Sequence, residues 1–304
     1  MNSQLLILAT LVSIVYGGHY GPSSMFAWKQ LEFGFPNQMA EEEAENSGNL
    51  IPTNAIPIDV EPFYDVSTDS RVAIKNQSEA YTTSSLAEDS QVNKCNQMWV
   101  IDSGVQGSKY VCPPKLLLID LYSNQVIHQY EFDDSLYIKD ASLFATVALN
   151  VKDPPPAGNC QNTMVYVADV GFHGLVVYNY QENRAWRIEN RFMYPNPDNG
   201  LLTVACKSFV LMDGILSLKS FVKLGERNSP CPVSAIDSSN NVYCVTLDPI
   251  RLIKWDVRKP YHKQYIEEFS VEHKELEFVS GIKYTEASSG RKEFWMISNR
   301  FQVF

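Results

Sequence analysis

"GLVVYNYQENRAWRIENR", residues 174–191, is the stretch that decides the expected fold of this chain. An apolar run reaches a polar turn at residues 181–184, and the chain then returns with apolar and charged residues in alternation. Alternation with a period of two is typical of a β-strand with one buried face. Two such strands around a short polar turn predict a β-hairpin.

The same hairpin pattern recurs twice, and each copy follows a second kind of strand. The other hairpins are "KLLLIDLYSNQVIHQYEF" from Lys115 and "RLIKWDVRKPYHKQYIEEF" from Arg251. The preceding strands are "MWVIDSG" (98–104), "MVYVADVG" (164–171) and "NVYCVTLDP" (241–249), and a fourth, "FWMISNRF" (294–301), has no hairpin after it. An all-β unit that recurs along a chain is typical of a blade array, so the sequence predicts a β-propeller.

Composition is consistent with one large all-β domain. The 304 residues are 45% hydrophobic and include 16 Tyr, 15 Phe and 5 Trp, which is enough to pack several sheet faces. The net charge of −10 disfavours nucleic acid as a partner, because phosphates require a basic surface. Small cationic molecules are compatible with this charge.

The N-terminal segment is interpreted as a signal peptide over residues 1–17. "LLILATLVSIV" (5–15) is an apolar run too short to span a membrane, and small residues follow it. No later stretch approaches the length of a membrane span, so we expect a secreted, extracellular protein without a membrane partner.

Six cysteines fit a secreted protein, and none lies in a C-x-x-C pair. The spacing therefore favours disulfides over a zinc or redox site, while six cysteines allow about fifteen complete pairings that the sequence does not distinguish. Asn76 begins the sequon Asn-Gln-Ser and is predicted to be glycosylated on a surface loop.

Residues 18–93 differ from the rest of the chain. They are mostly polar, with the acidic run "EEEAE" at 41–45 and a Ser/Thr-rich patch at 81–85, and we expect much of this segment to be poorly ordered. Dense strand patterns begin after it. The predicted organisation is a signal peptide (1–17), an N-terminal segment (18–93) and a β-propeller domain (94–304).

Four stretches together closely resemble the yellow and major royal jelly proteins of insects. They are "FAWKQLEFGFPN" (26–37), "CNQMWVIDSG" with "VCPPKLLLIDL" (95–121), "NTMVYVADVGFHGLVVYNYQENRAWRI" (162–188) and "FWMISNRFQ" (294–302). The resemblance implies a secreted six-bladed β-propeller. It also implies one of several roles: cuticle pigmentation and melanin chemistry, food jelly, or salivary sequestration of biogenic amines.

The chain is shorter than this resemblance predicts. Strand material is expected but missing near residues 62–93 and 222–234, and again after residue 304. The predicted fold is therefore an all-β, six-bladed type of propeller that is incomplete. Missing strands expose sheet edges and apolar faces, so any ligand site should be weakened.

Candidate site residues come from strand ends and from the resemblance. Asp102, Asp169 and Asn299 end what we interpret as innermost strands; such side chains could hold a hard cation that activates water, or could simply cap turns. The resemblance implies that Asn299 and Phe301 contact an aromatic amine. It also implies that Cys95, Cys112 and Cys160 occupy family positions, and we expect all three to be oxidised.

No known catalytic, metal or cofactor motif stands out elsewhere. The five histidines lack metal-ligand spacing, and no nucleophile elbow or phosphate-binding loop is present. We therefore expect no metal, no cofactor and no catalytic residues, and a noncatalytic binding or structural role with small aromatic amines or catechols as ligands. The alternatives are a melanin-pathway enzyme that converts dopachrome and a cation-dependent hydrolase. The oligomeric state stays open.

Overall fold

The computed structural model describes most of the predicted propeller region and parts of the N-terminal segment. The described residues are 9–16, 23–28, 35–47, 62–65, 70–73, 87–106, 109–190, 193–194, 224, 229, 231–247, 249–270, 278–286 and 292–299. The chain divides into two compact units, and each is treated by itself. Unit 1 comprises Met1–Asn76, Pro195–Gly214 and Val222–Phe304, and unit 2 comprises Gln77–Tyr194 and Ile215–Phe221.

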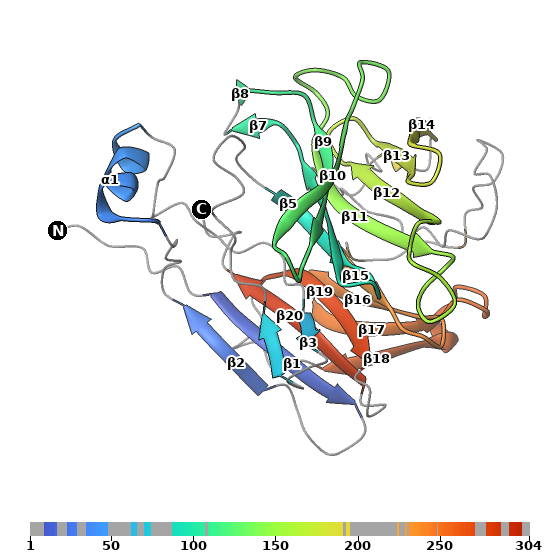
Figure 1. Ribbon diagram of the computed structural model, residues 1–304. Coiled ribbons are helices and arrows are strands. Elements are labelled where there is room, and N and C mark those ends of the chain that lie inside the picture. The colour runs from blue at the N-terminus through green and yellow to red at the C-terminus, as the bar shows by residue number, and fades with distance from the viewer. Residues whose placement is uncertain are drawn as a thin grey trace. The chain divides into compact units, whose positions relative to one another are not determined.

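Unit 2 contains two antiparallel four-stranded sheets (Figure 1). The first, sheet C, has the order β10-β9-β6-β5, with β5 (Ala87–Val92), β6 (Gln97–Asp102), β9 (Lys115–Asp120) and β10 (Gln125–Glu131). The second, sheet E, has the order β11-β12-β13-β14, with β11 (Phe144–Val151), β12 (Thr163–Asp169), β13 (Gly174–Asn179) and β14 (Arg184–Glu189). The hairpins predicted at 115–131 and 174–191 are confirmed.

The two sheets of unit 2 share one apolar core. Trp99 and Leu118 of sheet C pack in one buried cluster with Val165 and Tyr178 of sheet E. Apolar side chains on both sheets leave water together, which stabilises face-to-face packing of consecutive four-stranded sheets. The backbone amide of Leu149 also donates a 2.9 Å hydrogen bond to Oε1 of Gln91, so a polar contact joins β11 to β5.

Two hairpins carry a polar residue at the same place, where the first strand ends, and this residue caps the turn. Asp120 Oδ1 accepts hydrogen bonds from the amides of Tyr122 and Ser123, and Asn179 Oδ1 accepts one from Glu182. The residue that closes each of these two turns, Asn124 or Asn183, has a positive φ, which asparagine tolerates better than most side chains. Matching residues at matching places thus reflect one repeated hairpin.

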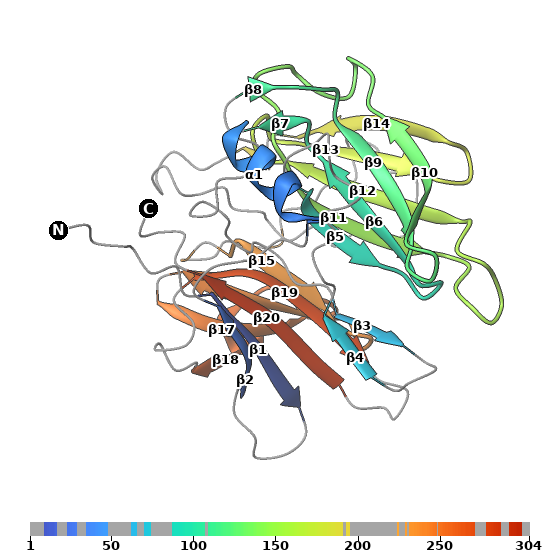
Figure 2. The ribbon, with the colours of Figure 1, turned by 60° about the vertical axis from the view of Figure 1, so that its left-hand side comes forward.

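Unit 1 contains two further four-stranded sheets. Sheet F has the order β15-β16-β17-β18, with β15 (Val233–Ile236), β16 (Asn241–Leu247), β17 (Ile250–Asp256), η5 (Lys263–Tyr265) before the last strand, and β18 (Ile266–Ser270). Sheet A has the order β19-β20-β1-β2, with β19 (Phe278–Glu286), β20 (Lys292–Asn299), β1 (Ala9–Tyr16) and β2 (Ser23–Trp28). Figure 2 shows these strands in a second view.

The fourth strand copy is completed by β1, which lies within the predicted signal peptide 1–17, and by β2, which lies in the N-terminal segment 18–93. Thr10 to Tyr16 of β1 pair with β20 in antiparallel register, and β2 pairs with β1 in turn. The sequence shows no hairpin after this strand, which predicted an incomplete unit. The completing strands come instead from residues that precede β20 in the chain. An unpaired edge of β20 accepts any strand of suitable register, wherever that strand lies in sequence.

The expectation that Asp102, Asp169 and Asn299 end innermost strands is wrong. Their strands, β6, β12 and β20, each lie between two neighbours within a sheet, whereas an innermost strand of a blade is an edge strand. The long apolar run of each strand fits this interior position, because a strand covered on both faces needs apolar side chains on both.

The remaining described elements are short. They are helix α1 (Gln38–Asn46), the pair β3 (Pro62–Asp65) and β4 (Ser70–Ala73), and the pair β7 (Val105–Gln106) and β8 (Lys109–Tyr110). The acidic run 41–45 lies in α1, which buries none of its residues. Across the ranges given above, no helix is long and apolar enough to cross a membrane. The described chain is thus nearly all β, built from antiparallel four-stranded sheets of the propeller-blade type.

Candidate functional site

Of the three candidate cation ligands, Asp102 and Asp169 lie in unit 2 and Asn299 lies in unit 1. Asp102 ends β6 and Asp169 ends β12, and both are buried. Asn299 ends β20 opposite Phe278 in the strand register. The side chain of Asn299 and the whole of Phe301 lie outside the described residues, so the amine contact predicted for this pair stays a prediction.

Asp169 is the centre of a buried hydrogen-bond network. Its Oδ1 accepts from the backbone amides of Leu143 and Phe172, each at 2.9 Å. Its Oδ2 accepts from the Ser142 hydroxyl at 2.6 Å and from Nη1 of Arg187 at 2.8 Å. A buried carboxylate needs such compensation, because its loss of hydration is costly. The carboxylate therefore has a structural task already.

Asp102 forms the corresponding ion pair in the other sheet. Its Oδ1 accepts from the Gly104 amide at 2.9 Å, and Oδ2 lies 3.1 Å from Nζ of Lys115. The same ammonium donates to Sγ of Cys112 at 3.4 Å. Burial alone would lower the pKa of Lys115, but its interactions with Asp102 and Cys112 outweigh burial and raise that pKa. Lys115 therefore stays protonated at neutral pH.

A stacked pair of tyrosines lies near these two ion pairs. The rings of Tyr110 and Tyr137 have centroids 5.8 Å apart and planes inclined by only 4°. Burial, aided by the charges of Tyr137 and Asp169, raises the pKa of Tyr110. The hydroxyl of Tyr110 is buried without a hydrogen-bond partner among the described residues, and the same holds for Ser103 Oγ. Buried polar atoms without a protein partner are commonly satisfied by ordered water.

Tyr137 belongs to an acidic loop, residues 132–143, that joins β10 to β11. Asp133, Asp134 and Asp140 oppose one cation, Lys139, so the loop carries a formal charge of −2. All four of these side chains are exposed. Burial and the charge of Asp134 raise the pKa of Tyr137. An aromatic ring beside exposed carboxylates is a suitable surface for a protonated aromatic amine.

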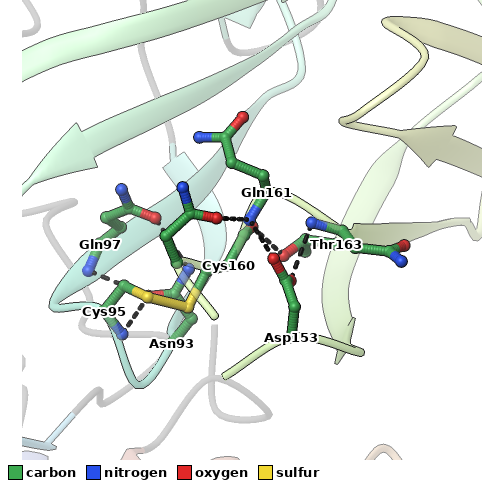
Figure 3. The surroundings of a disulfide bond; sticks show 9 residues. Asn93, Cys95, Gln97, Asp153, Cys160, Gln161 and Thr163 are labelled. Atoms are coloured by element: carbon green, nitrogen blue, oxygen red, sulfur yellow. Dashed lines mark hydrogen bonds between the residues drawn. A yellow bond between two sulfur atoms is a disulfide. The ribbon is translucent and has the colours of Figure 1, made fainter. Parts of the chain in front are cut away.

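A disulfide lies between the two sheets of unit 2 (Figure 3). Cys95, in the turn before β6, is bonded to Cys160, in the loop before β12. Asn93 Oδ1 accepts from the Cys95 amide at 2.9 Å, while the Cys160 amide donates to the carbonyl oxygen of Asp153 at 3.0 Å. The predicted oxidation of Cys95 and Cys160 is confirmed.

The other predicted modifications are only partly visible. A second disulfide joins Cys231 to Cys244 in unit 1. Cys112 has no disulfide partner among the described cysteines, and Cys206 lies outside the described part of the chain, so oxidation of Cys112 stays a prediction. Asn76 also lies outside the described residues, and its glycosylation stays a prediction.

Sequence reasoning missed most of this site. Three residues of the site were not singled out, because one decisive partner of each lies far along the sequence. They are Arg187, Lys115 and Tyr137, whose distant partners are Asp169, Asp102 and Tyr110. A signal did exist: a charged residue alternates with apolar residues at Arg187, and Lys115 opens an apolar strand. Within the described ranges, no three side chains among His, Cys, Asp and Glu gather in a metal-binding arrangement.

Comparison with known proteins supplies the family context for this geometry. The family model described as "Major royal jelly protein" matches residues 87–221 and 216–304. A dopaminechrome tautomerase of Drosophila melanogaster is 21% identical over 365 residues, covering 92% of this chain and 77% of that protein. Protein yellow of Drosophila madeirensis is 26% identical over 243 residues, covering 68% of this chain. The chain spans only 42% of the length of that yellow protein.

Among solved structures, a Cps50 (Swd1) β-propeller domain from Myceliophteria thermophila shows a slight similarity. The match covers 66% of this chain and 50% of that chain, with 12% sequence identity and a TM-score of 0.22. At this level of similarity, the fold assignment depends on the sheets and on the matched family model.

Proposed function

Since the chain belongs to the major royal jelly protein family, we propose that it is a secreted member which binds small aromatic amines or catechols without transforming them. The observation that carries the proposal is the stacked Tyr110–Tyr137 pair beside an exposed loop of charge −2. The aromatic ring of a ligand can pack on tyrosine, and its ammonium group can approach the loop carboxylates. Disulfides in both units support an oxidising, extracellular location.

The protonation states of the site favour binding over catalysis. A general acid or base works best when its pKa lies near the working pH. Three groups of this site have pKa values that already exceed neutrality, and the structure raises each of these pKa values further from pH 7. The groups are Lys115, Tyr110 and Tyr137. These groups can donate hydrogen bonds to a ligand, but they are poor bases at pH 7.

Calorimetric titration tests the binding proposal. We expect dopamine and serotonin to bind with dissociation constants above about 1 μM, because an open surface buries only part of a small ligand. Neutral catechol should bind more weakly than dopamine, since it lacks the ammonium group. Tyr137→Ala should weaken dopamine binding about tenfold, since an aromatic contact is lost. Tyr122→Ala, which changes an exposed tyrosine at the other end of sheet C, should not weaken it. Absence of binding to the unsubstituted protein would refute the proposal.

A second candidate function is conversion of an oxidised catechol. It is favoured by the similarity to a dopaminechrome tautomerase, which extends over 92% of this chain. Decay of dopaminechrome absorbance, with and without the protein, tests it directly. An accelerated decay that Tyr137→Ala removes would replace the noncatalytic proposal with the enzymatic one.

The cation-dependent hydrolase has the least support. Its candidate ligands, Asp102 and Asp169, each neutralise a cation of their own sheet, Lys115 or Arg187. A metal ion at either carboxylate would have to displace that internal partner. Insensitivity of any measured activity to chelators is the expected result.

A further inference from the structure

Arg187 contacts three segments of unit 2 through one guanidinium group. Nη1 donates to Asp169 at 2.8 Å and to the carbonyl oxygen of Leu136 at 3.0 Å, and Nη2 donates to the carbonyl oxygen of Phe172 at 3.0 Å. Nε donates to Glu189 at 2.8 Å. The side chain is only 9% exposed. A planar fork with several fixed donors suits this arrangement, and a lysine could satisfy only part of it.

One of these contacts ends on the loop that carries Tyr137, and a second reaches the same loop through Asp169. Leu136 directly precedes Tyr137 and is itself buried, so its carbonyl oxygen lies one residue from the stacked ring. At the far end of the loop, Ser142 and the amide of Leu143 donate to the Asp169 carboxylate that Arg187 neutralises. The segment 136–143 is therefore held at both ends by one ion pair.

A glycine makes room for the guanidinium. A Cβ placed on Gly174 would lie 2.3 Å from Nη2 of Arg187, which is too close for any real contact. Gly174 opens β13 and pairs with Glu189 on the neighbouring strand. Any side chain at position 174 would thus displace the guanidinium without removing a polar group.

From these contacts, we infer that Arg187 is a positioning residue for the aromatic site. Its guanidinium fixes the carbonyl oxygen of Leu136, and thereby holds the ring of Tyr137 against Tyr110. This inference rests on the proposed function for its consequence in binding, but its consequence for the loop can be measured without any ligand. Arg187 itself need not touch the ligand.

The test compares Arg187→Lys and Gly174→Ala with a matched control, Arg184→Lys, which changes an exposed arginine of the same strand. Hydrogen exchange reports on the amides of Ile138 and Ser142, which bond within the loop. Dopamine affinity is measured by calorimetry for the same proteins and for each variant combined with Tyr137→Ala. Thermal melts identify any variant that has lost its fold as a whole.

We expect Arg187→Lys and Gly174→Ala to speed exchange across 136–143 and to weaken dopamine binding about tenfold, a loss typical of a charge-assisted hydrogen bond. Tyr137→Ala should add little in either background, because a ring that is already misplaced contributes little. Unchanged exchange in this segment, or losses of affinity that add fully, would overturn the inference. If the unsubstituted protein bound no amine while Arg187→Lys still loosened the loop, only the proposed function would fail.

Discussion

Cys95 and Cys160 connect the two sheets of unit 2 by a disulfide whose Cα atoms are 6.3 Å apart and whose residues are 65 positions apart in sequence. The bond joins the turn before β6 to the loop before β12, and thus ties the second strand of one sheet to the second strand of the next. It crosslinks the two sheets that share the Trp99 core.

Removal of this disulfide should lower the free energy of unfolding of unit 2. Closing a loop of this length restricts the unfolded chain by about 4 kcal/mol in the chain-entropy treatment, and measured losses are typically about 2 to 4 kcal/mol. Urea unfolding of Cys95→Ser with Cys160→Ser tests the expectation. Cys231→Ser with Cys244→Ser is the matched comparison: that disulfide spans a sequence separation of only 13, so its removal should lower the free energy of unfolding by less.

The Arg187–Asp169 ion pair should contribute far more to the free energy of unfolding than the Arg187–Glu189 ion pair. Asp169→Asn leaves a buried guanidinium with only the half-exposed Glu189 as counter-charge, and the loss of a buried partner costs about 3 to 5 kcal/mol. Glu189 is 46% exposed, so Glu189→Gln removes a solvated ion pair worth about 0 to 1 kcal/mol. Equal losses for the two variants in urea unfolding would contradict the burial argument.

His128 should make stability fall as the pH decreases below about 6.5. Burial lowers the pKa of His128, so the unfolded chain takes up the proton at a higher pH than the folded chain. The stability associated with the neutral ring is complete above the unfolded pKa, and it declines as the pH falls from there toward the folded pKa.

His128→Gln gives the matched comparison for this pH effect. Nε2 of His128 lies 2.7 Å from the Tyr178 hydroxyl, which donates to Asn183, so a glutamine amide can still supply a donor to Tyr178. Thermal melts between pH 5 and 7 should show a smaller pH dependence for this variant. An identical dependence in both proteins would exclude His128 as its source.

The local pattern of the chain predicted the hairpins well, because each is specified by nearby residues. The alternation of side chains from Gly174 to Glu189 gives a β-hairpin, and Asn183 adopts the positive φ that its turn requires. The turn caps that the structure shows at Asp120 and Asn179 likewise depend on contacts within three residues. Such short-range preferences are encoded locally and can be read from one sequence.

The candidate site was not predictable in the same way. Arg187 meets Leu136 across 51 positions of sequence, and Tyr110 stacks on Tyr137 from another element altogether. The pairing of β1 with β20 joins the two ends of the chain. A period of two in the sequence specifies which residues share a face, but not which distant segment covers that face, because the covering depends on tertiary packing.

Secretion should remove residues 1–17 and add a glycan at Asn76. The apolar run 5–15 has the length of a signal peptide core, and Asn76 begins a sequon. Intact mass before and after enzymatic deglycosylation measures both changes on protein secreted from insect cells. A product that keeps Met1 and shows no mass change would contradict both expectations. Because β1 lies within the segment to be removed, the same measurement shows whether the mature chain contains this strand.

Hydrogen exchange of the unsubstituted protein, with and without saturating dopamine, tests most directly whether the protein binds an aromatic amine at Tyr110 and Tyr137. We predict slower exchange in two segments, 109–112 and 136–143, which carry these tyrosines, and less slowing in Tyr137→Ala at the same dopamine concentration. Slowing confined to the strands around Asn299 would instead place the amine at the residues implied by family resemblance. Dopamine that changes exchange nowhere would contradict the claim that this protein binds aromatic amines.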